Sequence, residues 1–325
     1  MTGLRLQCAS AAAAVVLDHL VGDPPDRLHP VAWFGRAMAR REAAAWSDDR
    51  LSGVRHLGAG LLLAALPVAA LRAGARRAGR FAVDGAFCVL VVAVTLGARS
   101  LDRRASEIAE ALERGQIERA RQLLPALAGR DAGGLDEAEI ARAVVESVAE
   151  NTVDAAVAPL LWAALAGPVG AAAYRALNTL DAMVGYRSER YRRFGWASAR
   201  ADDVANFVPA RLGALAVALC SPSKALDIVR AVRRQAPGHP SPNAGVVEAA
   251  FAAALGLRLG GTNRYGGVVE HRVALGDGRA PAAPDIARAR LLARRVIVLV
   301  AGALASPALL GLERPPRTAN DRGSR

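Results

Sequence analysis

The stretch ESVAENTVDAAVAPLLWAAL (residues 146–165) joins a carboxylate-bearing helical face to an uncharged apolar segment. Glu146, Glu150 and Asp154 follow one another at intervals of four residues, which places their side chains along one face of a helix. Charged groups at the edge of an apolar helix are costly, so they usually have a function. The stretch therefore predicts a membrane-entering helix with an acidic site at its edge.

The composition fits a helical membrane protein with long polar connections. The chain has 325 residues, of which 53% are hydrophobic, and its mean hydropathy is +0.20. That value is high for a soluble protein and low for a chain that lies almost wholly in lipid. Counting apolar runs against the ~20 residues that cross a bilayer, we expect an all-α, polytopic integral membrane protein with long polar helical loops. Its single catalytic domain would cover residues 1–312, with a disordered tail at 313–325 and spans at 4–20, 56–71, 81–98, 155–174, 204–220 and 296–312.

The positive charge of the chain argues for a membrane rather than for nucleic acid. The formal net charge is +12, and Lys224 is the only lysine. Aromatic residues make up 4%, and the arginines are scattered over the loops without interleaved stacking residues, so we expect no nucleic-acid partner. Loop arginines also set membrane topology. Those in residues 36–55 and 99–121 predict a multi-pass protein of the cell membrane whose active site faces the cytoplasm.

The span at residues 155–174 contains helix breakers. Pro159 and the pair Gly167-Pro168 interrupt it. We expect this helix to be broken or re-entrant, because residues 175–203 carry polar clusters that belong beside the others.

Two further polar sets lie next to apolar runs. Asn178 and Asp181 repeat the spacing of Asn151 and Asp154, and a third set in ADDVANFVPARL (201–212) contains Asp202, Asp203 and Asn206. Oxygen donors of this kind suit a divalent cation, which can in turn hold phosphates. Each set alone is as typical of a helix cap or of a solvated helix face paired with arginines. Three sets at apolar boundaries favour a site.

Arginines and a rigid turn supply the other candidate groups. Arg187 and Arg211 offer forked donors that match phosphate or carboxylate oxygens. The turn GDPPDRLHPV (22–31) carries Asp23 and His29. A structural turn explains its glycine and prolines, but it does not explain why ionisable side chains converge on one short segment: Asp18, His19, Asp23 and His29.

The stretch SPNAGVVEAAFAAALGLRLGGTNRYGG (241–267) predicts a helix that begins near Asn243 and a glycine-rich loop around Tyr265. Main-chain amides at a helix start can receive an anion. The glycines match no phosphate-loop pattern, so they add little by themselves.

Four ordered blocks together resemble the adenosylcobinamide-phosphate synthase family, also called cobalamin biosynthesis protein CobD/CbiB. The blocks are GDPPDRLHPVAWFG, ESVAENTVDAAVAPL, NTLDAMVGYRSERYRRFGWASARADDVANFVPARL and SPNAGVVEAAFAAALGLRLGGTNRYGG. The resemblance extends from about residue 15 to about residue 312.

This resemblance implies an integral membrane ligase of corrinoid synthesis. Such an enzyme joins the propionate carboxylate of adenosylcobyric acid to aminopropanol or its phosphate, with the corrinoid as substrate and not as cofactor. Amide formation from a carboxylate is uphill in water, so ATP and Mg²⁺ are expected. Membrane lipid is an expected partner, and other corrinoid-pathway enzymes and a second copy of the chain are further partners to test.

The roles of single residues come from their chemistry and not from the resemblance. We expect Asp23 or His29 to accept the amine proton, with Glu146 as a further catalytic group. The expected Mg²⁺ ligands are Glu150, Asp154, Asp202 and Asp203, and the expected substrate and phosphate contacts are Arg187, Arg211, Asn178, Asp181, Asn243 and Tyr265.

Two other protein classes stay open at this point. An intramembrane prenyltransferase also holds Mg²⁺ and a diphosphate with asparagine and aspartate clusters, but it should show more long spans and fewer polar loops. A transporter or membrane scaffold would need neither three acidic sets nor the GDPP turn.

Overall fold

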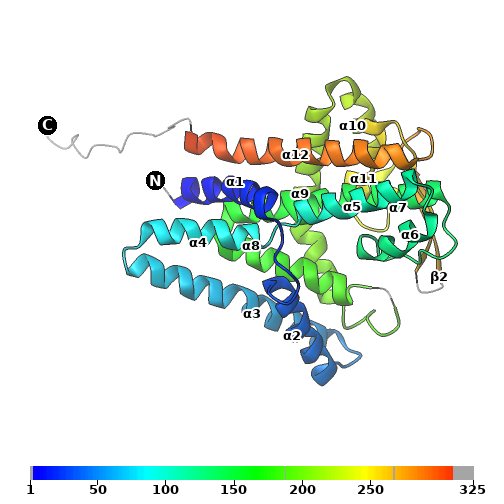
Figure 1. Cartoon of the computed structure of the whole chain (residues 1–325). Helices are drawn as coiled ribbons and strands as arrows, with labels where there is room; N and C mark the ends of the chain where they lie inside the picture. The colour runs from blue at the N-terminus through cyan, green and yellow to red at the C-terminus, as the bar shows by residue number, and fades with distance from the viewer. Residues whose placement is uncertain (1–2, 187, 266–267, 310–325) are drawn as a thin grey trace, which may run out of the picture.

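The chain is built almost entirely of helices (Figure 1). The computed structural model describes residues 3–186, 188–265 and 268–309. Its α-helices are α1 (Gly3–Val21), α2 (Pro30–Ala45), α3 (Arg50–Arg77), α4 (Phe81–Ala93), α5 (Ala98–Glu113), α6 (Ile117–Leu123), α7 (Glu137–Thr152), α8 (Ala158–Val184), α9 (Trp196–Cys220), α10 (Ala225–Arg234), α11 (Ala244–Leu255) and α12 (Ala283–Leu309). Strands β1 (Leu259–Tyr265) and β2 (Val268–Leu275) form an antiparallel hairpin between α11 and α12. The all-α fold predicted from the sequence is confirmed, with this hairpin as an addition.

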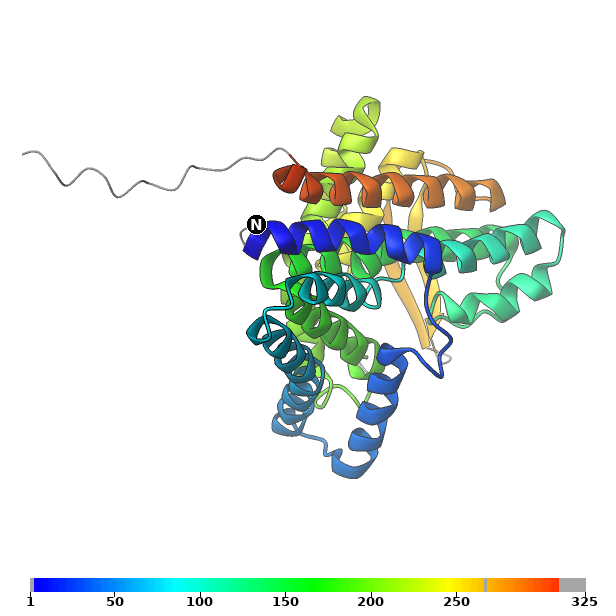
Figure 2. The ribbon, with the colours of Figure 1, turned by 60° about the vertical axis from the view of Figure 1, so that its left-hand side comes forward.

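The helices divide into an apolar half and a polar half. In Figures 1 and 2, α1, α3, α4 and the end of α12 lie on one side, and α5, α6 and α7 lie on the other. Helix α3 shows the character of the apolar half, because Leu62, Leu63, Leu66 and Leu71 are 48% to 62% exposed. A row of exposed leucines favours lipid over water as the neighbour of this half.

Five segments of the described chain are long and apolar enough to cross a membrane by length and composition: Gly3–Val21, Arg50–Arg77, Ala82–Glu113, Glu137–Val184 and Trp196–Cys220. Each overlaps one of the first five predicted spans. The sixth predicted span, 296–312, falls on α12, which is not among the five. Residues 310–312 and the predicted tail at 313–325 lie outside the described residues. These segments indicate a membrane protein, while its membrane and orientation stay predictions.

Helix α8 turns back sharply at Gly167, which has φ 68° and ψ −158° and is followed by Pro168. Asp154 and Asn178 are 24 residues apart, which is roughly 36 Å along a straight helix. Instead, Asn178 Nδ2 donates to Asp154 Oδ2 over 3.2 Å. The break predicted at Gly167-Pro168 therefore makes a helical hairpin whose two arms return to the same end of the molecule.

A π-helical turn (Val153–Val157) joins α7 to α8 and carries Asp154. Such turns disturb the regular hydrogen-bond ladder and are frequent at functional sites. Here the Asp154 carbonyl accepts from Arg175 Nη2 at 3.3 Å, and the Ala155 carbonyl accepts from the Gly97 N–H at 3.0 Å. These bonds hold the turn, and with it the direction of the Asp154 side chain.

Helix α7 is fixed firmly in the polar half. It begins with a capping box, in which Asp136 accepts from the Glu139 N–H and the Glu139 side chain accepts from the Asp136 N–H. Its apolar side, with Ile140 and Val144 fully buried, packs against α5, α11 and α12. The acidic stretch thus stands on a rigid support.

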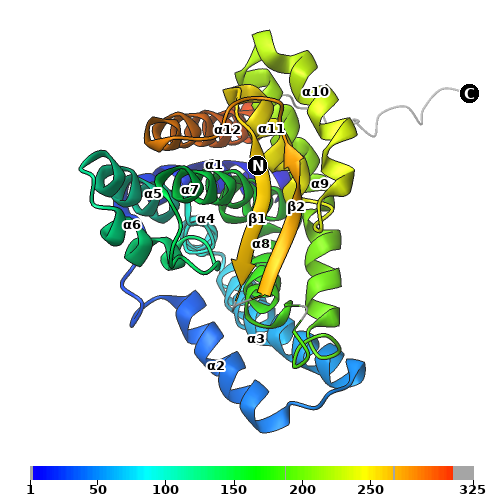
Figure 3. The same ribbon diagram turned by 90° about the vertical axis from the view of Figure 1, so that its right-hand side faces the viewer.

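Helix α9 lies at the boundary of the two halves and runs across the other long helices. Figure 3 shows it upright, whereas α1 and α12 lie crosswise in Figures 1 and 2. It packs against α3, α8, α11 and α12. Helix α9 therefore contacts elements of both halves.

We expect Gly167→Ala to lower the free energy of unfolding by about 1–3 kcal/mol, because the backbone conformation at Gly167 is open almost only to glycine. A Cβ there would also meet the Arg72 guanidinium. Thermal unfolding in detergent, followed by circular dichroism, measures the loss. Gly74→Ala is the control, since it is helical and has open space around it. An unchanged unfolding midpoint for Gly167→Ala would show that the reversal of α8 does not require glycine at this position.

Candidate active site

Three of the predicted metal ligands face one small cavity. Glu150 from α7, Asp154 from the π turn and Asp202 from α9 line a space of about 30 Å³, together with Asn206, Ser241 and Asn243. We call this space the acidic cavity. Its walls come from α7, α9 and the start of α11, so the fold gathers segments that are far apart in the sequence.

Neutral groups hold the aspartates of the acidic cavity. Asn178 Nδ2 lies 3.2 Å from Asp154 Oδ2 and 3.5 Å from Asp202 Oδ1. Asn206 Nδ2 donates to Asp202 Oδ2 at 3.0 Å, and its Oδ1 accepts from the Tyr174 hydroxyl at 2.8 Å. These bonds orient both carboxylates but do not neutralise them.

Arg175 stands behind the acidic cavity, and the sequence analysis missed it. Its Nε donates to the Thr95 carbonyl at 2.7 Å, and its Nη1 donates to Asn178 Oδ1 at 3.2 Å. The charges of Asp154 and Asp23 both act on it. Arg175 is the first charged residue after the uncharged apolar run, and this position is the signal that could have identified it.

The donor set of the acidic cavity fits Mg²⁺, which prefers oxygen ligands. The hydrogen bonds that reach Asp154 and Asp202 come from amides and a phenol, so the carboxylates leave an excess of negative charge for a cation to offset. Within residues 3–186, 188–265 and 268–309, no three His, Cys, Asp or Glu side chains are gathered closely enough to hold a metal ion as they stand. The metal assignment stays a prediction.

Asp23 and His29 meet at the turn before α2. His29 Nε2 lies 3.4 Å from Asp23 Oδ1, and His29 caps α2 through its other ring nitrogen. Burial raises the pKa of Asp23, but hydrogen bonds from His29 and Ser100 and the charges of His29 and Arg175 outweigh it and hold that pKa below its ordinary value. Asp18 turns away and accepts from a main-chain N–H of α5. The predicted proton acceptors are therefore one ionised carboxylate and its histidine partner.

Glu146 lies outside the acidic cavity in a buried ion pair. Arg130 Nη2 is 2.6 Å from Glu146 Oε2, while Oε1 accepts from the Gly260 N–H at 2.8 Å and lies 3.5 Å from Arg142 Nη1. Each step of four residues rotates a helix position by about 40°, so Glu146 and Asp154 look toward different neighbours. Its partners tie the β hairpin to α7, and its catalytic role stays a prediction.

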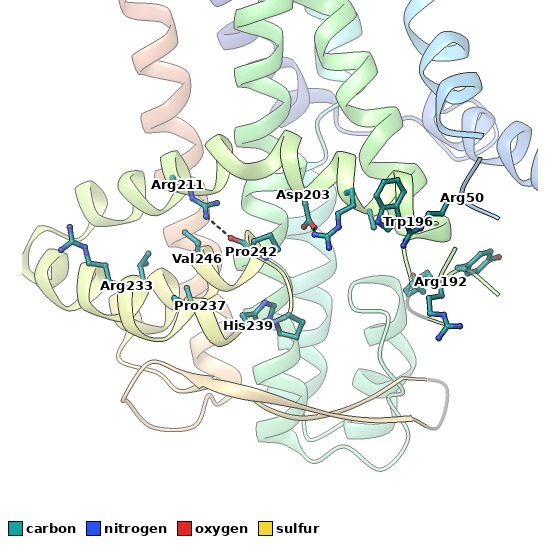
Figure 4. Close-up of a pocket in the computed structure, with 18 residues that line it drawn as sticks. Arg50, Arg192, Trp196, Asp203, Arg211, Arg233, Pro237, His239, Pro242 and Val246 are labelled. Atoms are coloured by element: carbon teal, nitrogen blue, oxygen red, sulfur yellow. Dashed lines mark hydrogen bonds and ion pairs between the residues drawn. The ribbon is translucent and has the colours of Figure 1, made fainter. Parts of the chain in front are cut away.

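Asp203 faces a larger groove on another side of α9. This groove has a volume of about 910 Å³, and Asp203 is the single acid among its lining residues. Figure 4 shows Trp196 at the first turn of α9 and His239 below this helix. We call it the arginine groove after Arg50, Arg192, Arg200, Arg211 and Arg233.

The acidic cavity and the arginine groove share a wall. Asn243 lines the cavity, and its Oδ1 accepts from Nη1 of the groove residue Arg211 at 2.8 Å. Asn243 Nδ2 donates to the Asp203 carbonyl at 2.7 Å. Figure 4 shows the second bond of Arg211, from Nη2 to the Pro242 carbonyl at 3.2 Å. A ligand in the groove is thus separated from the cavity by the start of α11 and one side of α9.

The remaining predicted contacts are less well defined. Asp181 lies one turn beyond Asn178 on α8, near enough to Asp202 for its charge to act. Arg187 lies outside the described residues, as does the side chain of Tyr265, whose backbone belongs to β1. Their substrate contacts stay predictions.

A second buried pair was also missed from the sequence. His239 Nε2 lies 3.8 Å from Glu248 Oε1, and both side chains are 2% exposed. Burial, followed by the charges of Glu146 and Glu150, raises the pKa of Glu248, and burial lowers the pKa of His239. Both shifts favour the uncharged forms. His239 lines the arginine groove, and the charge of the cavity residue Glu150 acts on Glu248.

The fold and the site define a class: a helical membrane protein in which a cavity lined by oxygen donors lies beside a groove lined by arginines. More particularly, the chain belongs to the CobD/CbiB family, since the family model described as "CobD/Cbib protein" matches residues 11–293. This confirms the resemblance seen in the sequence.

Several curated relatives carry the name "Cobalamin biosynthesis protein CobD". The protein of Mycobacterium tuberculosis (strain ATCC 25618 / H37Rv) is 48% identical over 304 residues, which cover 93% of this chain and 95% of the relative. That of Pelobacter propionicus is 42% identical over 273 residues, covering 82% and 84%. That of Halalkalibacterium halodurans is 39% identical over 295 residues, covering 88% and 92%. No solved structure matches the chain.

We expect Glu146→Gln to lower the free energy of unfolding by about 3–5 kcal/mol, because it leaves the Arg130 charge buried without its partner. Thermal unfolding in detergent and protease cleavage within residues 259–275 measure the loss. Glu107→Gln is the matched control: its pair with Arg103 is exposed and 4.0 Å long, so the change should cost less than about 1 kcal/mol. Equal stability of the two variants would contradict the structural role of Glu146.

Proposed function

We propose that the protein is an amide-forming ligase of cobalamin synthesis, which joins the propionate carboxylate of adenosylcobyric acid to aminopropanol or its phosphate. Membership of the CobD/CbiB family supports the pathway. The observation that supports the chemistry is the wall shared by the acidic cavity and the arginine groove. A phosphate-driven ligation needs a place for anions directly beside a place for their counter-cation.

The proposed reaction is coupled to ATP. The carboxylate oxygen attacks the γ-phosphorus of ATP, which gives an acyl phosphate and ADP. The amine nitrogen then attacks the acyl carbon, the new C–N bond forms, and the C–O bond to phosphate breaks. Inorganic phosphate and one proton leave with the amide product, adenosylcobinamide or its phosphate. The protein must hold the phosphates, take up the proton and keep water from the acyl phosphate.

The arginine groove is the proposed phosphate site. Five arginines face one acid there, and forked guanidinium donors match phosphate oxygens. Arg211 is held in place by Asn243 and by the Pro242 carbonyl. Its position is therefore fixed before a substrate binds, which lowers the entropy lost on binding. We assign Arg211 as the main phosphate contact.

Glu150, Asp154 and Asp202 are the proposed Mg²⁺ ligands in the acidic cavity. When bound, Mg²⁺ would offset the negative charge of the reacting phosphates. Asn178 and Asn206 orient the two aspartates. Asp203 is left out of the set because it lines the groove instead.

Asp23 and His29 are the proposed acceptors of the amine proton. They line a hollow of about 790 Å³, and the Arg175 charge acts on both Asp23 and the cavity residue Asp154. The ionised Asp23 can take the proton through its histidine partner. The prenyltransferase and the transporter considered from the sequence gain no support from the family match.

We expect Asp202→Asn to lower the rate of amide formation by about 100-fold or more, because one charge of the cation site is lost. The assay combines the purified protein in detergent with adenosylcobyric acid, aminopropanol phosphate and MgATP, and detects the amide by mass. Raising the Mg²⁺ concentration should restore part of the rate.

Asp227→Asn is the matched control for that assay. Asp227 lies on α10, with pairs to Lys224 and Arg230 that are about half exposed, so the change should alter the rate by less than about fivefold. No amide from the unaltered protein under any nucleotide condition would refute the proposed reaction. Full activity of Asp202→Asn would remove the acidic cavity from it.

A further inference from the structure

Helix α9 has one side toward the acidic cavity and a broad, mostly apolar side that also carries Arg200 and Arg211. Asp202 and Asn206 point to the acidic cavity, and Arg200 and Arg211 line the arginine groove. The apolar residues of that broad side are 38% to 77% exposed: Val204, Phe207, Val208, Leu212, Leu215 and Leu219. Spacings of three and four residues place these side chains on one side of the helix. None of them lines the cavity or the groove, although the Arg211 guanidinium lies 3.7 Å from the centre of the Phe207 ring.

The direction of α9 limits what can cover this face. Figures 1 to 3 show α9 running across α1 and α4, which both belong to the apolar half, and Figure 4 shows it crosswise to α12. A bilayer that α1 and α4 cross would therefore leave α9 along its surface. The 25 residues of α9 would otherwise have to cross the bilayer at right angles to their neighbours.

We infer that α9 is an interfacial helix that rests on the membrane surface, with its apolar face among the acyl chains next to the headgroups. It is not a span in this arrangement, although its length and composition would allow one. The charge of this region fits: residues 196–234 contain six basic and three acidic residues, which favours anionic phospholipids. The arginine groove then opens to water directly at the membrane surface.

A second copy of the chain is the other occupant that an exposed apolar face could take. The direction of α9 and its excess of basic residues both favour lipid, because a like-charged copy would have to bring its own basic residues close. The inference concerns membrane position and does not depend on the proposed reaction, so a failed amide assay would leave it intact.

The test places single nitroxide labels at positions 204, 208, 212, 215 and 219 of the full chain. Cys8 and Cys88 are buried and stay in place, and Cys220→Ala removes the remaining thiol. Labelled variants that elute like the unaltered protein are inserted into vesicles of phosphatidylcholine and phosphatidylglycerol. Collision with oxygen and with a nickel chelate then reports the depth of each label.

An interfacial helix requires all five labels at one shallow depth, about 5–10 Å below the phosphates. A span would instead carry them to the bilayer centre at about 15 Å and spread their depths widely. Labels at Leu51, Leu62 and Leu71 of α3, which are all more than half exposed, are the control and should differ strongly in depth. A span-like depth profile for α9, labels open to water, or spin–spin broadening between copies would each overturn the inference.

Discussion

The site depends on the reversal of one helix at Gly167. Because this residue adopts a conformation open almost only to glycine and Pro168 cannot continue the hydrogen-bond ladder, the apolar segment folds back on itself. Asp154 and Asn178 therefore meet at the same end of the hairpin. A straight helix of the same composition would carry these two groups to opposite ends and leave no acidic cavity.

Carboxylates that repel one another stay together only if their surroundings are rigid. The π turn fixes Asp154 through bonds from Arg175 and Gly97 to its carbonyls. The buried Glu146 pairs with Arg130 and accepts from the Gly260 N–H of β1, which ties the β hairpin to α7. Glu146 thus contributes to the site as a support, since a ligand-binding group must be held by its neighbours before the ligand arrives.

The charged side chains of the candidate site lie at the boundary between the apolar and polar halves. The acidic cavity lies on one side of the α9–α11 wall and the arginine groove on the other, and Asn243, which lines the cavity, bonds to the groove residues Arg211 and Asp203. Because this wall separates the carboxylates of the cavity from the arginines of the groove, their charges do not cancel each other. The ligation proposed above would use this arrangement, with a cation on one side of the wall and phosphates on the other.

The sequence by itself determined the helical class, the positions of five apolar segments, the break at Gly167-Pro168 and the kinds of oxygen donor at the site. Local periodicity and turn chemistry carry that information. Only the tertiary structure decided which donors meet. Asp202 and Asp203 are adjacent, yet a helix turns by about 100° per residue, so one faces the acidic cavity and the other the arginine groove. Arg175 lies beside the acidic cavity and Glu146 lies outside it, because each bonds to groups far away in the chain. Periodicity says which face a residue occupies but not what packs against that face.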